Sequence, residues 1–127
     1  MIRLPLSLPN RTKRLDIEPY ILGKSDSLYI LNKPWGWPTS GATLDDDDCV
    51  QYHLMQYHQS MVWTVHQLDA DTTGVCLFAT HKRKVKVYHR KLTAPHTAKQ
   101  YLAVVRGEPN WKQIEVTKPI GLSLIHI

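Results

Sequence analysis

The shortness of the apolar runs most constrains the fold of this chain. Residues 75–79 and 102–105 are among the longest runs, and each has the size of one β-strand. Prolines and glycines separate these runs. None of the runs approaches the length that spans a bilayer. The 127 residues suit at most one domain, and that length can bury a core without disulfide or metal support.

The hydrophobic pattern predicts four strands, at residues 27–32, 62–66, 75–79 and 99–106. Val50, Leu54 and Tyr57 share one helical face, and the aspartates at 45–48 are expected to cap that helix. A second, basic helix is expected at 81–92. Strands alternate with helices without repeats, so we expect a mixed α/β or α+β sheet domain.

The first part of the chain differs in composition from the rest. Residues 1–24 are rich in proline and basic residues, and we expect an irregular arm before a domain at 25–121. Pro5 and Pro9 interrupt any signal-peptide core.

Cys49 and Cys76 form no C-x-x-C pair and are interpreted as buried thiols in a reducing compartment, with a disulfide as the lesser alternative. The expected location is the cytoplasm, or an organelle if the source is eukaryotic.

Positive charge is concentrated in one part of the sequence. The formal net charge is +5, yet no Asp or Glu occurs between Thr72 and Gly107. That stretch carries eight cations: Lys82, Arg83, Lys84, Lys86, Arg90, Lys91, Lys99 and Arg106. Such a stretch favours a polyanion as partner, and nucleic acid is the commonest one. A solvated helix face is an equally weighted alternative from charge alone.

The polar segment 66–74 joins two predicted strands and has the most reactive composition in the chain. It contains Asp69, Asp71, Thr72 and Thr73. Catalytic groups favour such fixed turns, although ordinary turns use the same residue types. The seven histidines form no ligand set, and the aspartate run lacks the spacing of a calcium loop, so no metal site is expected. The four tryptophans are expected mostly to pack in the fold, with stacking on RNA bases as the alternative.

Three motifs in this order resemble those of the RluA-type RNA pseudouridine synthases. Asn32-Lys33-Pro34 with Gly36 is similar to the first family motif, which is Asn or Asp, Lys, Pro, any residue, Gly. Segment 66–74, HQLDADTTG, is similar to a second motif, His-Arg-Leu-Asp-x-x-Thr-Ser-Gly. Lys99-Gln100-Tyr101 is similar to a third, Lys-x-Tyr in a strand. The resemblance covers about residues 27–109.

The resemblance implies an isomerase that converts uridine to pseudouridine in rRNA or tRNA without a cofactor. It implies an α+β fold with a mixed, largely antiparallel β-sheet and flanking helices, present here incompletely. Asp69 would be the catalytic carboxylate, as nucleophile or as base. The other implied substrate-binding residues are Tyr101, Lys99, Gln67, Leu68, Thr72, Thr73 and His66. RNA is the expected partner, with no membrane and no obligate protein partner, and the residues expected to contact its backbone are Lys82, Arg83, Lys84, Lys86, Arg90 and Lys91. Lys33, Pro34 and Gly36 would form a loop at the site.

Two departures from the family pattern define the alternatives. Gln67 stands where the family has arginine, which removes a charge. No arginine motif follows Pro119, so a carboxy-terminally truncated fragment is expected. Residues 122–127 match the translation of a transposon-end sequencing adapter, which favours non-native read-through, with a natural apolar terminal strand as the alternative. The alternative functions are an inactive RNA-binding module of the same fold and, least favoured, a structural or adaptor domain.

Overall fold

The computed structural model describes residues 15–119. The chain divides into two compact units, Met1–Thr97 and Ala98–Ile127. The elements of the first unit begin with a short 3-10 helix, η1 (Glu18–Tyr20), followed by β1 (Ile21–Lys24), β2 (Leu28–Lys33) and helix α1 (Val50–His58). They continue with β3 (Trp63–Thr64), β4 (Gly74–Ala79), a second 3-10 helix η2 (Lys82–Lys84) and α2 (Val85–Thr93).

The strands form one sheet in the order β1-β2-β4-β3, and all three pairings are antiparallel. The central pair is the longest, with Leu28 opposite Ala79 at one end and Lys33 opposite Gly74 at the other. This antiparallel sheet with two α-helices confirms the predicted α+β class. The strands predicted at 27–32 and 75–79 correspond to β2 and β4. The strand predicted at 62–66 corresponds to β3, which is shorter than predicted.

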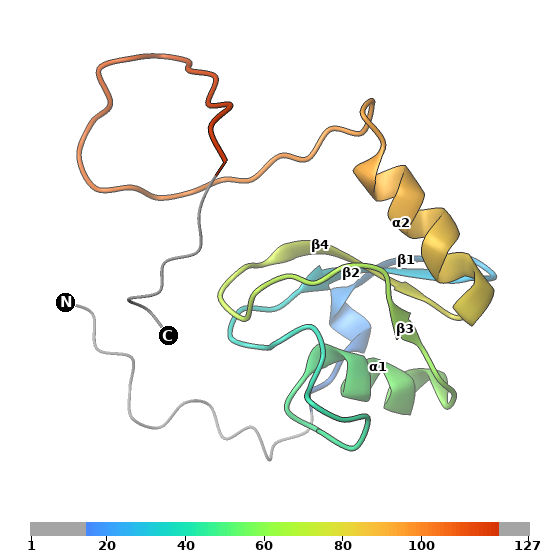
Figure 1. Ribbon diagram of the computed structural model, residues 1–127. Coiled ribbons are helices and arrows are strands. Elements are labelled where there is room, and N and C mark those ends of the chain that lie inside the picture. Colours follow the sequence, from blue (N-terminus) through green and yellow to red (C-terminus); the bar gives the residue numbers. More distant parts are fainter. Residues whose placement is uncertain (1–14, 120–127) are drawn as a thin grey trace. The chain divides into compact units, whose positions relative to one another are not determined.

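The core lies between the sheet and α1 (Figure 1). Alternation along β2 and β4 directs Leu31, Cys76 and Phe78 to one face, where each is fully buried. Val50 and Leu54 are four residues apart on α1 and are equally buried against that face. Tyr57, predicted to share their face, is 45% exposed.

Helix α2 lies on the other side of the sheet in Figure 1, above its right-hand end. It follows η2 directly, so the basic helix predicted at 81–92 is present with a 3-10 first turn. The hydroxyls of Tyr88 and Ser27 are hydrogen-bonded, which links α2 to the segment just before β2. Its basic residues Arg90 and Lys91 lie in the last turn, where the helix dipole favours positive charge.

The predicted aspartate cap of α1 is wrong. Cys49 is the N-cap residue and makes no side-chain cap bond, while the backbone N–H groups of Val50 and Gln51 donate to the carbonyls of Pro38 and Thr39. Asp46 instead accepts a hydrogen bond from the backbone N–H of Asp48 at 3.0 Å and so organises its own loop. A distant loop thus satisfies donors that a local cap would have satisfied.

Two further expectations differ from the structure. Residues 15–24, expected to be irregular, contain η1 and β1, and the side chain of Ile17 is buried in the core. Residues 99–106, expected to be a strand, have no strand structure, because no described segment supplies the hydrogen-bonded neighbour that a strand needs. The segments 1–14 and 122–127, for which the sequence also carries expectations, lie outside the described residues.

Candidate active site

Two loops that carry family-like motifs leave the same end of the sheet. The register pairs Lys33, the last residue of β2, with Gly74, the first residue of β4. The loop that starts at Pro34 and the turn 66–73 that precedes Gly74 are therefore neighbours. Residues 33 and 69 are far apart in sequence, and the antiparallel pairing brings their segments together (Figure 1).

The Lys33 ammonium group joins these two loops. Its side chain is fully buried, and Nζ donates to the carbonyl oxygens of Pro34 at 3.0 Å, Trp37 at 2.7 Å and Ala70 at 3.2 Å. An ammonium group has three donors, so these bonds use all of them. Burial lowers the pKa of Lys33, and the neighbouring Cys76, Asp71 and Asp69 oppose that shift. Lys33 is therefore a structural cation inside the site.

Backbone and hydroxyl contacts add to this connection. The N–H of Gly36 donates to the carbonyl of Ala70 at 2.8 Å, and Gly36 has a φ of 85°, which favours glycine. The buried hydroxyl of Thr39 donates to the carbonyl of Leu68 at 2.7 Å and accepts from the N–H of Leu68 at 2.9 Å. The residues on both sides of Asp69 are thus bonded to the facing loop.

Asp69 itself is exposed. Its carbonyl accepts a hydrogen bond from the N–H of Thr72 at 3.0 Å, which closes a tight turn. Leu68 before it is buried, while Asp71 and Thr73 are exposed and Thr72 is half-buried. A carboxylate on a fixed backbone, with its side chain open to solvent, can approach a reacting sugar without rearrangement of the fold.

The two residues before Leu68 have hydrogen bonds of their own. The Gln67 amide oxygen accepts from the Ser40 hydroxyl at 3.1 Å, and its nitrogen donates to the Thr64 hydroxyl at 3.3 Å. The Nε2 atom of His66 accepts from the backbone N–H of Leu77 at 3.1 Å. His66 therefore extends the contact between β3 and β4, and Gln67 lies across the gap between the two loops.

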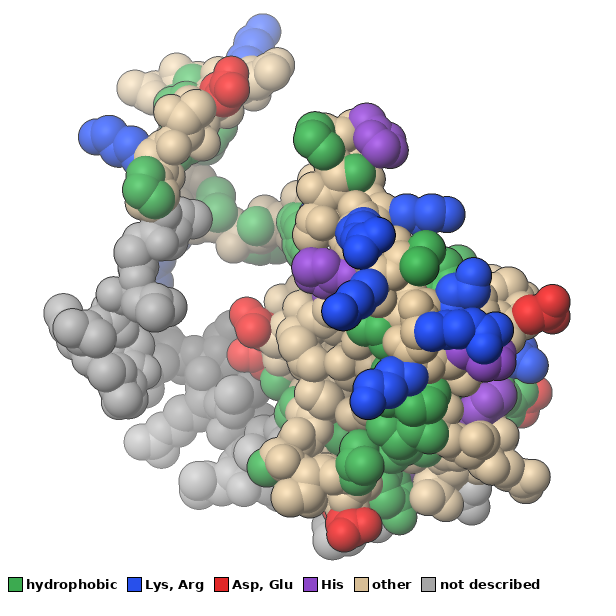
Figure 2. All heavy atoms as spheres, turned by 45° about the vertical axis from the view of Figure 1, so that its right-hand side comes forward, with side chains coloured by type: hydrophobic (Ala, Val, Ile, Leu, Met, Phe, Trp, Pro, Cys, Tyr) green, Lys and Arg blue, Asp and Glu red, His purple; other side chains and the backbone are tan. Residues whose placement is uncertain are grey.

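The basic residues predicted to contact RNA lie on η2 and α2. Lys84 is half-buried and the others are exposed. Figure 2 shows Lys and Arg side chains gathered on the face that carries α2, with few acidic side chains among them. We call this surface the basic face, made up of Lys82, Arg83, Lys84, Lys86, Arg90 and Lys91.

Lys99 and Tyr101 belong to the second compact unit, whose described part, residues 98–119, contains no helix or strand. Both side chains are exposed. The structure brings together the segments containing Lys33, Gly36 and Asp69, all of which belong to the first unit. The place of Lys99 and Tyr101 at the site stays a prediction.

Sequence reasoning missed two residues that organise the site, Thr39 and Ser40. Thr39 holds the backbone of Leu68, and Ser40 holds the side chain of Gln67. The available signal was a pair of adjacent hydroxyl residues directly after Pro38, in a loop otherwise rich in tryptophan. Their partners lie 29 and 27 residues further along the chain, so the pattern alone does not reveal these contacts.

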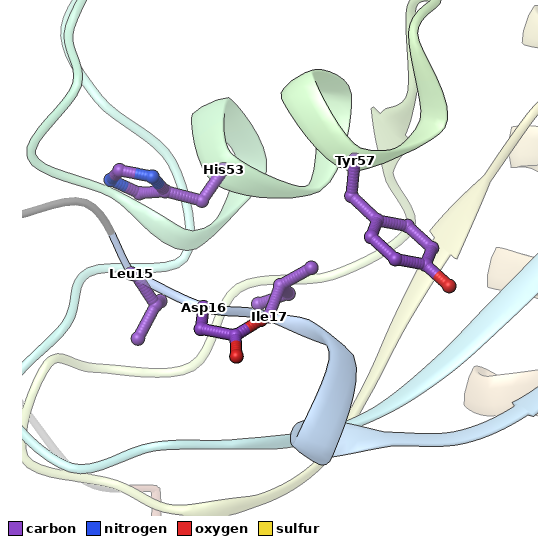
Figure 3. Close-up of a pocket in the computed structure, with 5 residues that line it drawn as sticks. All are labelled: Leu15, Asp16, Ile17, His53 and Tyr57. Carbon is purple, nitrogen blue, oxygen red and sulfur yellow. The ribbon is translucent and has the colours of Figure 1, made fainter.

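A shallow pocket of about 270 Å³ lies elsewhere, between residues 15–17 and α1 (Figure 3). Its lining is Leu15, Asp16, Ile17, His53 and Tyr57, none of which the sequence assigned to the site. Among residues 15–119, no group of three or more His, Cys, Asp or Glu residues is arranged to hold a metal ion. No helix in this described range is long and apolar enough to cross a membrane.

Comparisons with known proteins agree with the motifs. A family model described as RNA pseudouridylate synthase matches residues 27–123. Ribosomal large subunit pseudouridine synthase C of Haemophilus influenzae is 33% identical over 100 residues, which cover 78% of this chain and 31% of that protein. The protein of the same name from Escherichia coli K12 is 30% identical over 101 residues, 79% of this chain and 32% of that protein.

A solved structure named Human RNA Pseudouridylate Synthase Domain Containing 4 matches 60% of this chain and 30% of its own, with 26% identity and a TM-score of 0.46. The chain spans about a third of the length of the curated relatives it matches. The family match covers both loops that meet around Lys33 and Ala70. The chain belongs to the RNA pseudouridylate synthase family.

Proposed function

We propose that this chain carries the catalytic aspartate of an RNA pseudouridine synthase, and that Asp69 is that residue. The observation that supports this most is the contrast between an exposed Asp69 side chain and the bonded backbones of Leu68 and Ala70. A residue that only formed a turn would not need its neighbours held from a second loop. A catalytic carboxylate does, because its reach toward the ribose depends on backbone position.

The reaction is an isomerisation. The bond between N1 of uracil and C1′ of ribose breaks, the base turns, and a bond from C5 to C1′ replaces it. The C5 proton is lost and N1 gains one, so atoms and electrons balance without an oxidant, a reductant or a cofactor. Asp69 acts as nucleophile at C1′ or as the base that opens a glycal route, and either role requires a carboxylate next to the sugar.

The remaining site residues have distinct proposed roles. Tyr101 packs on the uracil and keeps it in the site while it turns, and Lys99 adds positive charge beside it. Gln67, Thr72 and Thr73 offer hydrogen bonds to the nucleotide from the Asp69 turn. His66 and Leu68 hold that turn in shape, as do Lys33, Pro34 and Gly36 in the facing loop. Residues 25–121 belong to one partial catalytic domain in this account.

The proposed substrate is large-subunit rRNA in the cytoplasm, in preference to tRNA. Several relatives carry names that specify the large ribosomal subunit. The basic face binds the phosphates, because a uridine presented to Asp69 must leave its stack and the backbone contacts offset a cost of a few kcal/mol.

The test compares two exposed carboxylates of one turn. Asp69→Asn and Asp71→Asn are assayed for pseudouridine formation on large-subunit rRNA, in the full protein that contains this chain. Asp69→Asn is expected to form no product and still bind RNA, whereas Asp71→Asn keeps both properties. Equal product from wild type and Asp69→Asn contradicts the assignment.

One observation favours a second candidate, an RNA-binding module without activity. Gln67 replaces the family arginine, and its amide is bonded to Ser40 and Thr64. A neutral, held side chain cannot make the charge contacts of arginine. This candidate predicts salt-sensitive RNA binding with no product from the wild-type protein, so the same assay separates the two functions.

A further inference from the structure

Trp35 lies between two residues that the site holds in place. The carbonyl of Pro34 accepts a hydrogen bond from Lys33 Nζ at 3.0 Å, and the N–H of Gly36 donates to Ala70 at 2.8 Å. The backbone of Trp35 is therefore fixed beside the residue that follows Asp69. No other tryptophan of the described chain has both neighbours bonded in this way to the Lys33 cation and the Asp69 turn.

Trp35 is nevertheless 49% exposed. Trp37, two residues later in the same loop, packs against the core and meets the ring of His53 edge to face at 5.3 Å. One tryptophan of the loop thus contributes to packing and the other presents a large apolar ring to solvent from a rigid backbone. A half-exposed tryptophan on a fixed backbone has only two side-chain torsions to order when a flat ligand covers its ring, so the entropy cost of covering it is small.

We propose that Trp35 is a stacking platform for an unpaired base of the RNA, a neighbour of the uridine that enters the site. This inference rests on the proposed function. A uridine that leaves its stack exposes the faces of the adjacent bases. Every base has such a face, so an aromatic side chain on the loop that is bonded to the Asp69 turn can cover it without reading sequence.

The platform complements the basic face. Phosphate contacts attract paired and unpaired RNA alike, because both carry the same backbone charge. Stacking on Trp35 requires a base that is free of its neighbour. Trp35 therefore confers a preference for looped over fully paired RNA, which the basic face does not provide.

The experiment measures binding of the 127-residue chain to two fluorescein-labelled RNAs of equal length, a stem–loop with uridine in its loop and a blunt duplex. Trp35→Ala is expected to weaken stem–loop binding roughly tenfold and to leave duplex binding unchanged. Trp35→Phe keeps an aromatic face and is expected to retain most of the affinity. Tyr57→Ala is the matched control, since Tyr57 is 45% exposed on α1 and outside the site.

Two results overturn the proposal. One is unchanged stem–loop affinity in Trp35→Ala. The other is a loss of thermal stability in Trp35→Ala as large as in Trp37→Ala, which assigns Trp35 to packing. The binding assay requires no turnover, so it tests Trp35 even where Asp69→Asn still makes product. A failure of stacking likewise leaves the assay of Asp69 unaffected.

Discussion

The Nζ atom of Lys33 lies 3.2 Å from the carbonyl oxygen of Ala70, the residue directly after Asp69. The same nitrogen holds the carbonyls of Pro34 and Trp37, so one buried cation joins the two loops of the site. A lysine is rarely buried unless its charge is matched by hydrogen-bond acceptors or opposite charges. Here three carbonyl dipoles provide that match, with Asp69 and Asp71 nearby.

Removal of this cation should loosen both loops. Lys33→Met keeps the length of the side chain but leaves three carbonyls without their donor, and we expect a loss of about 3 kcal/mol in the free energy of unfolding. Urea denaturation measures it. Lys82→Met is the control, because Lys82 is exposed and its loss should change stability by less than about 0.5 kcal/mol. Equal stability of the two variants would contradict the structural role of Lys33.

The stability of the fold should depend on the single hydroxyl oxygen of Thr39. Thr39→Val keeps the shape and removes the hydroxyl, which leaves the N–H and the carbonyl of Leu68 unpaired in a buried position. The expected cost is about 2 kcal/mol, seen as a lower melting temperature. Thr39→Ser retains the hydroxyl, so its loss of stability should be clearly smaller. A Val variant as stable as the Ser variant would refute the contact.

The thiol of Cys76 should make stability depend on alkaline pH. Burial raises its pKa to about 11 in the folded chain, from an ordinary value of 9.0. A folded pKa above the unfolded one gives a contribution that is complete below pH 9 and is lost as the pH rises through 11. The stability of wild type relative to Cys76→Ala should therefore fall between pH 9 and 11 by roughly 2 kcal/mol. A constant difference across that range would show that the thiol does not resist ionisation.

The basic face should account for the salt dependence of RNA binding. Lys86→Gln with Arg90→Gln removes two charges from α2, and Lys112→Gln with Lys118→Gln removes two from the second unit. Each lost phosphate contact lowers the slope of log affinity against log salt by about 1. We expect the double variant in α2 to reduce the steepness of this slope by about 2 and the double variant in the second unit to reduce it by less. Fluorescence anisotropy at several salt concentrations measures the slope. A larger effect of the variant in the second unit than of the variant in α2 would contradict RNA binding on the basic face.

The parts of the fold that follow from local pattern were predictable. Strands β2 and β4 coincide with short apolar runs bounded by turn residues, and the basic helix has a regular apolar face. Strand β1 was missed because Ile21–Lys24 is short, contains a glycine and acquires its structure by pairing with β2. The strand predicted at 99–106 has the right pattern without a described partner, which shows that pattern and pairing are separate requirements.

The same distinction between local pattern and long-range pairing explains which parts of the site were predictable. The motifs marked Lys33, Gly36 and Asp69 by resemblance, but nothing local predicted that Lys33 is fully buried. Its acceptors lie one, four and 37 residues away, and the last of these becomes a neighbour only when β2 pairs with β4. The same pairing explains why Thr39 and Ser40 went unnoticed, since their partners are in the Asp69 turn.

The most direct test of this account is pseudouridine content in large-subunit rRNA after incubation with wild-type, Asp69→Asn and Asp71→Asn forms of the full protein that contains this chain. We predict product from wild type and Asp71→Asn and none from Asp69→Asn, with RNA binding kept by all three. Product from Asp69→Asn at the wild-type rate, or loss of product in both variants alike, would contradict the assignment of Asp69 as the catalytic carboxylate.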